Sequence, residues 1–279
     1  MWRKAFVVIL LLGPARCGGN SPNSPSPTAG SGSGSGAPTS VAIAAGVDLM
    51  KLKATGTFGL TANYSNGSAG SVQGTWRSDN PSVATVDTMG RVTATGAGET
   101  NIIAEFQGLR AAQPLRVVPD YQGRWSGDFS VTRCTADGDF QRGNFCAEFP
   151  TADLFALTMG LTQNRDAVNG SSDFGDLPGP VQGSIRTSGH LMLSASFTLP
   201  EEDIVIDVAL TDWEALTTDN ERMTGRFAFA VRASGLQGTA RIECDLRIFG
   251  KTSTTPVAAQ SRAGGRIFPD AVSRAVRRR

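Results

Sequence analysis

The sequence is poor in the residues on which most catalytic and metal sites depend. It has one histidine, His190, and four cysteines among 279 residues, so no second histidine is available for a zinc site of the ordinary type. It also lacks a Gly-x-Ser-x-Gly motif, a phosphate-binding loop and a dinucleotide-binding fingerprint. We therefore predict that the protein is not an enzyme and uses neither a metal nor a cofactor.

Long apolar runs are missing as well. The longest, AFVVILLLG at 5–13, is well short of the about 18 residues that a membrane-spanning helix needs. It follows the basic start MWRK, and a positive segment before an apolar one is typical of an export signal. We predict a signal over residues 1–16 and a mature protein in the periplasm or at the cell surface.

The residue after the predicted signal is Cys17. It resembles the lipid-acceptor cysteine of bacterial lipoproteins, which implies a lipid anchor in the membrane, although Pro14 and Arg16 depart from that family's pattern. Cleavage after Ala15, whose side chain is small, is the alternative. Residues 17–38 are rich in Gly, Ser and Pro and carry no charge, which predicts a flexible tether between the anchor and the first domain.

Charge is divided unevenly along the chain. Residues 17–249 carry 16 basic and 24 acidic side chains, a net charge of −8. Such an acidic body is a poor nucleic-acid binder, because binding to nucleic acid depends on neutralising phosphates with Lys and Arg. Residues 251–279 carry seven basic side chains against one acid and end in AVRRR, and we expect them to form a disordered basic tail.

Short runs of β-forming residues, separated by turn residues, fill the segment 39–119. About seven strands in some eighty residues are typical of an immunoglobulin-like sandwich. Trp76 is the natural core tryptophan, and because the segment has no cysteine, the sandwich must close on apolar packing alone. The runs are SVAIAA, GTFGLTANYS, GSVQGTWRS, SVATVD, GRVTATGAG, TNIIAEFQG and LRVVP.

This segment, over about residues 39–119, resembles the bacterial immunoglobulin-like domain, group 2. The resemblance implies a rigid spacer or adhesive module of exported and surface proteins, with no catalytic residues to carry over. The local chemistry agrees, since Asn80-Pro81 favours a turn and Gly90 and Gly98 suit a positive φ. The residues that carry the resemblance are Trp76, Ser78, Asn80, Pro81, Val83, Ala84, Val86, Asp87, Gly90, Val92, Thr93, Ala94 and Gly98.

Residues 120–250 continue as longer strands in which apolar and polar residues alternate. One apolar and one charged face predict an antiparallel up-and-down barrel with an apolar interior. The opening YQGRWSGDFSV and the Gly-rich turns resemble avidin-like and lipocalin-like barrels, without a ligand-binding signature of either family. The eight predicted strands are 122–133, 154–163, 166–173, 180–187, 189–198, 204–214, 222–232 and 236–249.

The same alternation sorts three of the cysteines. Cys134 and Cys146 flank the loop TADGDFQRGNF, and disulfides persist in exported proteins. Cys244 shares a strand face with Ile242 and Leu246, so it points into the barrel. We predict a Cys134–Cys146 disulfide and a buried free thiol at Cys244.

These inferences predict a non-enzymatic envelope protein in which an immunoglobulin-like spacer presents a barrel for adhesion or for recognition of a glycan or protein. Aromatic residues near the loops are expected to be exposed and to make the contacts, and the alternative is that they cap the barrel ends. A second hypothesis is a carrier that holds a small apolar ligand inside the barrel, and a third is a role in assembling an envelope complex. The candidate contact residues are Tyr121, Phe140, Phe145 and Trp213.

Overall fold

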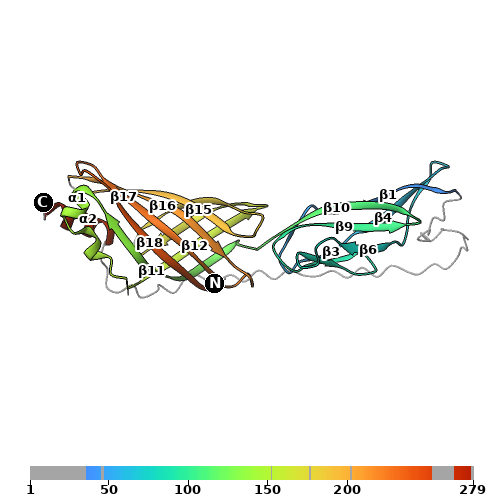
Figure 1. The fold of residues 1–279 in the computed structure, drawn as a ribbon, viewed down its shortest axis with the longest axis horizontal. Coiled ribbons are helices and arrows are strands. Elements are labelled where there is room, and N and C mark those ends of the chain that lie inside the picture. Colours follow the sequence, from blue (N-terminus) through green and yellow to red (C-terminus); the bar gives the residue numbers. More distant parts are fainter. Residues whose placement is uncertain are drawn as a thin grey trace, which may run out of the picture.

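The computed structural model describes residues 36–44, 47–151, 153–175, 177–201, 203–252 and 267–277. They form two bodies arranged end to end, an immunoglobulin-like domain and a β-barrel (Figure 1). The predicted all-β class, a sandwich followed by an eight-stranded antiparallel barrel, is confirmed. The predicted signal and Cys17 lie outside the described residues. Among the helices that are described, none has the length and apolar character needed to cross a bilayer.

Ten strands form the immunoglobulin-like domain. They are β1 (Pro38–Ala44), β2 (Leu49–Lys51), β3 (Thr55–Thr57), β4 (Gly59–Tyr64), β5 (Ala69–Ser71), β6 (Thr75–Ser78), β7 (Ala84–Val86), β8 (Arg91–Ala94), β9 (Gly98–Phe106) and β10 (Leu109–Val118). Their sheets have the orders β1-β4-β5, β2-β10-β9-β6 and β3-β8-β7. The strands outnumber the predicted runs because some runs divide between sheets: GTFGLTANYS, for example, contributes β3 to one sheet and β4 to another.

The sequence motif of this domain is structural. Ile102 and Val117 are fully buried in its core, and Trp76 packs against that core while remaining partly exposed. Gly90 has a φ of 78°, and a Cβ atom there would lie 2.3 Å from the carbonyl oxygen of Phe58. Only glycine combines this left-handed conformation with so close a contact, as the motif predicted.

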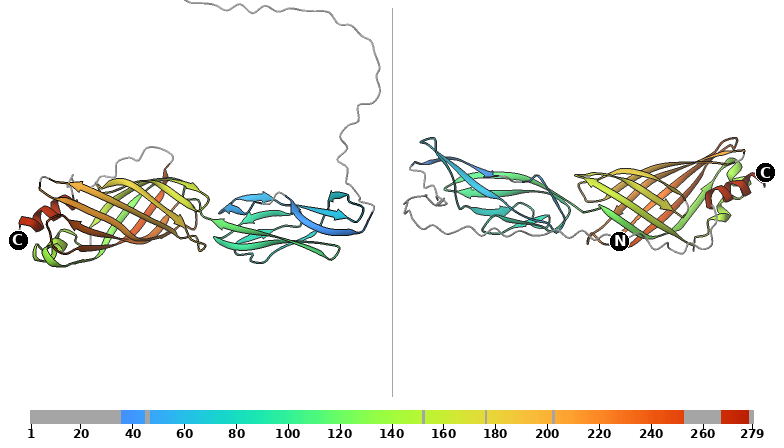
Figure 2. Two further views of the ribbon diagram at one scale, coloured as in Figure 1. Left: turned by 90° about the horizontal axis from the view of Figure 1, so that it is seen from above. Right: turned by 180° about the vertical axis from the view of Figure 1, so that it is seen from behind.

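Eight strands form the barrel, and the last pairs with the first to close it (Figure 2). Every predicted strand is present, with both ends within four residues of the prediction. The strands are β11 (Gly123–Ala136), β12 (Leu154–Asn164), β13 (Ala167–Phe174), β14 (Pro178–Ile185), β15 (Leu191–Pro200), β16 (Val205–Leu216), β17 (Met223–Ala233) and β18 (Ala240–Thr252).

Aromatic side chains fill the barrel interior. The rings of Phe129, Phe174, Phe227 and Phe229 lie 5.2–6.1 Å from one another in edge-on or tilted arrangements, which is the favourable range for aromatic pairs. The void beside Phe129 is about 10 Å³, hardly the space of one water molecule. At this point the interior is occupied by protein and holds no room for an apolar ligand.

Two of the barrel's register shifts lie next to large aromatic side chains. In β16 the pairing with β17 shifts between Thr211 and Glu214, and Asp212 has a φ of 53°. This extra residue reverses the alternation, so Trp213 points into the barrel. In β18 the pairing with β11 skips Phe249, whose side chain remains 61% exposed.

The expectation of a disordered tail over 251–279 is wrong in part. Lys251 and Thr252 complete β18, and residues Ile267–Arg277 form a helix, α2. Phe268, Ala271 and Val272 are buried while Asp270, Arg274 and Arg277 are exposed. The helix is therefore held by an apolar face that docks on the barrel. In the sequence, the many basic residues obscure the helical spacing of these apolar side chains.

Candidate functional site

The two ends of the barrel are built differently. The proximal end faces the immunoglobulin-like domain and consists of the links 165–166, 186–190 and 217–222. The distal end carries a distal cap made of a short helix α1 (Gly138–Arg142), a 3-10 helix η1 (Phe145–Glu148) and α2. Figure 1 shows the cap at the far end of the molecule from the immunoglobulin-like domain.

Tyr121 closes the proximal end from inside. Its side chain is fully buried, and its hydroxyl lies 2.8 Å from the carbonyl oxygen of Gly189 and 3.3 Å from that of Ala215. The hydroxyl also accepts a hydrogen bond from the backbone N–H of Thr217 (3.3 Å). Burial raises the pKa of Tyr121 well above its ordinary value, so the phenol stays protonated and acts as a structural plug.

Trp213 belongs to the interior packing. Its indole stacks on Phe227 with ring centroids 5.2 Å apart and meets Phe174 edge-on at 6.1 Å. The side chain is 1% exposed. It is unavailable to a partner outside the barrel.

Phe140 and Phe145 lie inside the distal cap. Phe140 comes from α1 and Phe145 from η1, and their rings meet edge-on at 5.3 Å. Phe145 continues to Phe149 at 5.0 Å, and Phe149 to Phe268 of α2 at 5.7 Å. The two predicted contact residues thus form the cap's own core.

The expectation that these four aromatic residues are exposed is therefore wrong. Each is at most 1% exposed, and they lie at opposite ends of the barrel, Tyr121 and Trp213 toward the proximal end and Phe140 and Phe145 in the distal cap. The bulge at Asp212 explains why Trp213 is buried, because without the bulge the alternation of β16 places this side chain on the outside of the barrel. The others are buried because the open ends of a barrel need apolar side chains to seal them.

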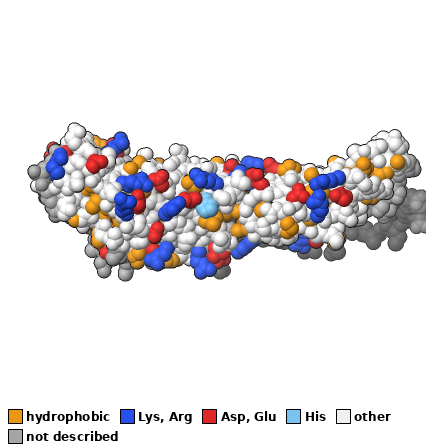
Figure 3. All heavy atoms as spheres, in the orientation of Figure 1, with side chains coloured by type: hydrophobic (Ala, Val, Ile, Leu, Met, Phe, Trp, Pro, Cys, Tyr) orange, Lys and Arg blue, Asp and Glu red, His pale blue; other side chains and the backbone are white. Residues whose placement is uncertain are grey.

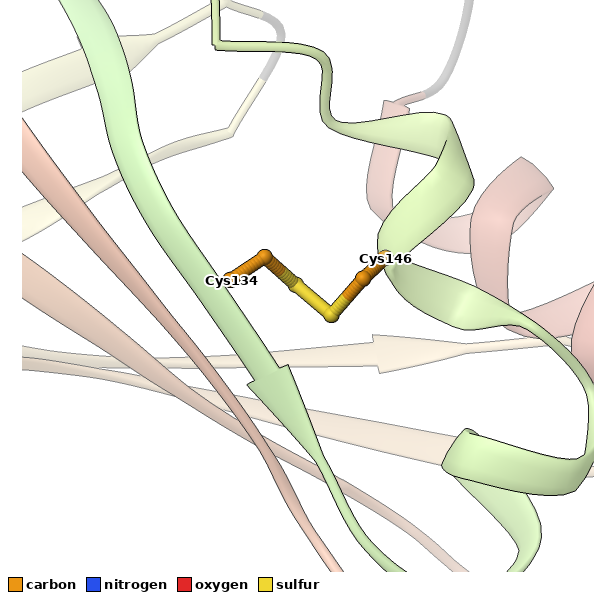
Figure 4. Close-up of a disulfide and its surroundings, with 2 residues drawn as sticks. All are labelled: Cys134 and Cys146. Atoms are coloured by element: carbon orange, nitrogen blue, oxygen red, sulfur yellow. A yellow bond between two sulfur atoms is a disulfide. The ribbon is translucent and has the colours of Figure 1, made fainter.

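The predicted disulfide is present and anchors the cap. Cys134 on β11 is bonded to Cys146 on η1, with their Cα atoms 5.5 Å apart (Figure 4). Cys244 is a free, buried thiol, also as predicted, and burial raises its pKa to about 12. A thiol that stays protonated is unreactive, so the cysteines of the barrel are structural.

Carboxylate side chains pin α1 to the neighbouring link between β17 and β18, the strand that pairs with β11. Asp139 accepts a hydrogen bond from the backbone N–H of Gln237 (2.7 Å), and Asp137 accepts one from the backbone N–H of Thr239 (2.6 Å). Both acceptors come from the motif DGD, and both donors lie just before β18. These carboxylates hold the loop in place.

The two domains meet at a joint that contacts three separate links of the barrel. At the first link, Arg165 donates two hydrogen bonds to the carboxylate of Asp48, at 3.2 and 2.7 Å. Next to the second link, Arg116 donates to the carbonyl oxygen of Ile185, the last residue of β14 (2.8 Å), and it also donates to Asp166 of the first link (3.3 Å). Such fork-shaped guanidinium contacts fix direction as well as distance.

At the third link, Asn220 bridges the domains. Its side-chain oxygen accepts the backbone N–H of Asp120 (3.0 Å), and its side-chain nitrogen donates to the carbonyl oxygen of Leu52 (3.2 Å). Nearby, Lys51 donates to the Asp120 carboxylate at 2.7 Å, and Lys251 donates to the Asp120 carbonyl oxygen at 2.5 Å. Three contact points around one axis fix an orientation that a single linker leaves free.

Ion pairs stabilise the joint between the two domains at neutral pH. The hydrogen bond from Arg165 lowers the pKa of Asp48 below its ordinary value. Burial alone raises the pKa of Asp120, but Lys51 and Lys251 outweigh it, so this pKa is lowered too. Both carboxylates are therefore ionised, and paired, throughout the neutral range. Sequence patterns do not identify these residues, because the partners are far apart in the chain.

The surface beside the joint is polar. A groove of about 740 Å³ runs along β18 and the link 217–222, and it includes Lys53, Arg222 and the exposed ring of Phe249. On the face of the molecule drawn in Figure 3, basic and acidic side chains are interspersed, with no large area of one sign. The lone histidine, His190, makes a local hydrogen bond to Ser188 (2.9 Å). Within the described part of the chain, no group of three or more potential metal ligands is found.

Comparison with known proteins supports the assignment of the first domain. Residues 51–105 match the family described as "Intimin, immunoglobulin-like domain". The immunoglobulin-like character of this segment is thus confirmed, although the matching family is the intimin one and differs from the group 2 domain that the motif suggested. No curated protein gives a significant match to the chain.

Three solved structures that align with the chain resemble it distantly. Domains 5–6 of the S-layer protein SbsC align at a TM-score of 0.27 and 13% identity, covering 74% of this chain and 97% of that one. Domains 4–9 of the same protein align at 0.27 and 12%, covering 74% and 31%. A fatty-acid-binding protein isolated from Manduca sexta aligns at 0.18 and 14%, covering 46% and 100%. At these scores the likenesses carry no argument about function.

Proposed function

We propose that this chain is an exported, non-enzymatic surface protein in which the immunoglobulin-like domain holds the barrel away from the cell for adhesion, through recognition of a glycan or protein. The observation that carries the proposal is the joint. A carrier or an enzyme domain gains nothing from a fixed orientation to a spacer, whereas a surface module must be presented in a defined direction. The match to an intimin immunoglobulin-like domain supports the same setting.

The order of the parts agrees with presentation at a surface. The chain enters the immunoglobulin-like domain at Pro38, the start of β1, at the end remote from the barrel (Figure 1). An anchor at Cys17, which we include in the proposal, then places the barrel outermost. The distal cap becomes the part of the molecule farthest from the membrane.

The distal rim offers apolar contacts at its edge. Leu154 at the start of β12 is 55% exposed, and Val205 at the start of β16 is 40% exposed. Beside the cap's core lie the exposed guanidinium groups of Arg142 and Arg274. Scattered apolar and basic groups of this kind suit a protein or an acidic glycan as partner.

The proposal is tested in the producing bacterium after deletion of the chain and complementation with variants. Antibodies against the barrel are expected to label intact cells, and attachment to surfaces coated with glycans or extracellular proteins is expected to fall after deletion. Arg165→Glu, which breaks the joint, is expected to reduce attachment without lowering the amount displayed. The matched control, Asp48→Arg with Arg165→Glu, restores a charge pair across the joint and is expected to restore attachment.

Two results overturn the proposal. One is a barrel that antibodies reach only after the cells are broken. The other is attachment that does not change when the chain is deleted.

A further inference from the structure

The groove beside the joint is built by both domains. Three segments that are far apart in the chain line it: the turn after β2, the link 217–222 and the end of β18. Ligand sites occur preferentially at domain interfaces, and the groove's volume of about 740 Å³ is in the range of sites for small ligands. Its lining includes Lys53, Asp219, Glu221, Arg222, Phe249 and Lys251.

An exposed aromatic ring forms part of the groove. Among the large apolar side chains that the structure describes, five are exposed, and Phe249, at 61%, is the only aromatic one. The ring lies outside the barrel core because the pairing of β18 with β11 skips this residue. Aromatic side chains are enriched where proteins bind partners. The negative face of such a ring attracts C–H groups, and one face of a sugar ring is made of them.

Three cationic side chains line the same groove. Arg222 is 74% exposed, and its Nε contacts Asp219 at 3.2 Å, so its two terminal nitrogens remain for a ligand. Lys53 uses one of its three N–H donors on the carbonyl oxygen of Asp219, at 3.0 Å. The Nζ atom of Lys251 is held over the ring of Trp125, 4.8 Å from its centroid. The groove therefore presents positive charge at fixed positions.

The two acidic side chains of the lining have different roles. The carboxylate of Asp219 accepts the backbone N–H groups of Arg222 (2.8 Å) and Glu221 (2.9 Å). These hydrogen bonds lower the pKa of Asp219 well below its usual range and turn its carboxylate toward its own link. Glu221 is exposed and can accept hydrogen bonds from hydroxyl groups. A ligand thus meets three cations, one carboxylate and one aromatic ring.

We propose that this groove binds an acidic glycan, a chain of sugar rings that carry carboxylates. Phe249 stacks on one ring, the terminal nitrogens of Arg222 bind a carboxylate in a two-pronged contact, and Glu221 accepts sugar hydroxyls. An acidic peptide satisfies the cations but offers no rigid ring face to Phe249. The inference rests on the proposed function, because it names the class of ligand and the place of the recognition that adhesion requires.

The joint then has a part in binding. Lys53 belongs to the immunoglobulin-like domain, whereas Arg222, Phe249 and Lys251 belong to the barrel. The groove is complete only while the joint holds the two domains in one orientation. Lys53 also has a φ of 69°, a left-handed conformation that is uncommon for lysine. Strained backbone of this kind is found at binding sites.

Binding of defined oligosaccharides tests the proposal. The chain is purified with Cys17→Ser, to avoid lipid, and titrated into fluorescently labelled hexasaccharides of galacturonate and of hyaluronate. Fluorescence polarisation is expected to show binding to at least one of them, weakened at high salt because exposed charges are screened. Two control ligands separate the contributions: the methyl ester of the galacturonate hexasaccharide keeps the rings without the charge, and hexaglutamate keeps the charge without the rings. Both are expected to bind about tenfold more weakly or worse.

Variants of the groove locate the site. Phe249→Ala and Arg222→Gln are each expected to weaken binding about tenfold, and neither side chain is part of the core. Met89→Ala is the matched control for Phe249→Ala, because it removes an exposed apolar side chain (75%) that does not line the groove, and it is expected to leave binding unchanged.

A variant that opens the joint tests the part of Lys53. Arg165→Glu does not touch the groove and is expected to weaken binding about threefold. Adding Asp48→Arg is expected to restore it.

Three results overturn the inference. The first is no binding of either hexasaccharide at about 1 mM. The second is binding that Phe249→Ala and Arg222→Gln leave unchanged, which places the site elsewhere. The third is hexaglutamate that binds as tightly as the hexasaccharides, which assigns the groove to acidic peptides.

This experiment and the attachment experiment can fail separately. Cells that lose attachment on deletion, while the purified chain binds no hexasaccharide, retain the proposed function and lose only this site. A purified chain that binds through the groove, while deletion leaves attachment unchanged, retains the site and loses the role in adhesion.

Discussion

Removing the Cys134–Cys146 disulfide is expected to destabilise the barrel as a whole. The bond closes a loop with a sequence separation of 12, and loop-closure entropy for that length corresponds to about 3 kcal/mol of stability. The loop includes Phe140 and Phe145, which are buried in the distal cap. Because the cap and the barrel share one continuous hydrophobic core, we expect the loss to appear in the main unfolding transition.

The assay is urea unfolding of Cys134→Ala with Cys146→Ala, followed by tryptophan emission. Trp125 and Trp213 are both buried in the barrel, so they report on its unfolding. Reduction of the wild-type disulfide is expected to give the same shift. The control is Cys244→Ala, which removes a buried sulfur but no covalent link and is expected to cost about 1 kcal/mol.

A loss of less than about 1 kcal/mol in the main transition refutes this reasoning. So does a separate early transition that appears in far-ultraviolet circular dichroism but not in tryptophan emission. Either result means that the cap unfolds independently and that the disulfide stabilises only the cap.

Three further predictions concern the joint and the barrel wall. Arg165→Glu is expected to leave the unfolding free energy within about 1 kcal/mol of wild type, because exposed ion pairs contribute little. Small-angle scattering is expected to show a broader distribution of the molecule's end-to-end length, and adding Asp48→Arg is expected to narrow that distribution again. Since the pKa values of Asp48 and Asp120 are lowered, the joint keeps its full strength above about pH 4 and weakens as the pH falls further; scattering that does not change down to about pH 2 contradicts this. Gly183→Ala places a Cβ 1.8 Å from a backbone oxygen of β15 and is expected to lower the free energy of unfolding by about 3 kcal/mol, measured by thermal unfolding. A much smaller loss of stability argues against the close contact between the two strands.

The barrel was largely predictable from alternation. A strand with one buried face repeats every second residue, so Leu191, Leu193 and Phe197 identify both the strand and its inward side. Alternation fails where one residue is added. The positive φ of Asp212 has no clear sequence signature, and without it Trp213 is assigned to the wrong face.

The functional surfaces were less predictable, because they depend on distant pairs. Arg165 and Asp48 are 117 residues apart, and neither stands in a motif. The helix α2 is hard to recognise in the sequence because basic residues dominate its end, with Arg274 and Arg277 in its last turn, although Phe268, Ala271 and Val272 have helical spacing. Pro269 fits this helix because proline is tolerated in a first turn.

The pairing of β11 with β18 sets an order for folding. The first strand of the barrel has one permanent neighbour in β12, and its other edge stays unpaired until the chain is complete to Thr252. Contacts between segments so far apart form slowly, because a long loop must close before they are gained. An unpaired edge invites pairing with other chains. The immunoglobulin-like domain precedes the barrel, and all of its strand pairs lie within its own residues. The barrel, in contrast, remains open to aggregation until its last strand arrives. A chain truncated before the final residues of β18 is therefore the most hazardous to its cell.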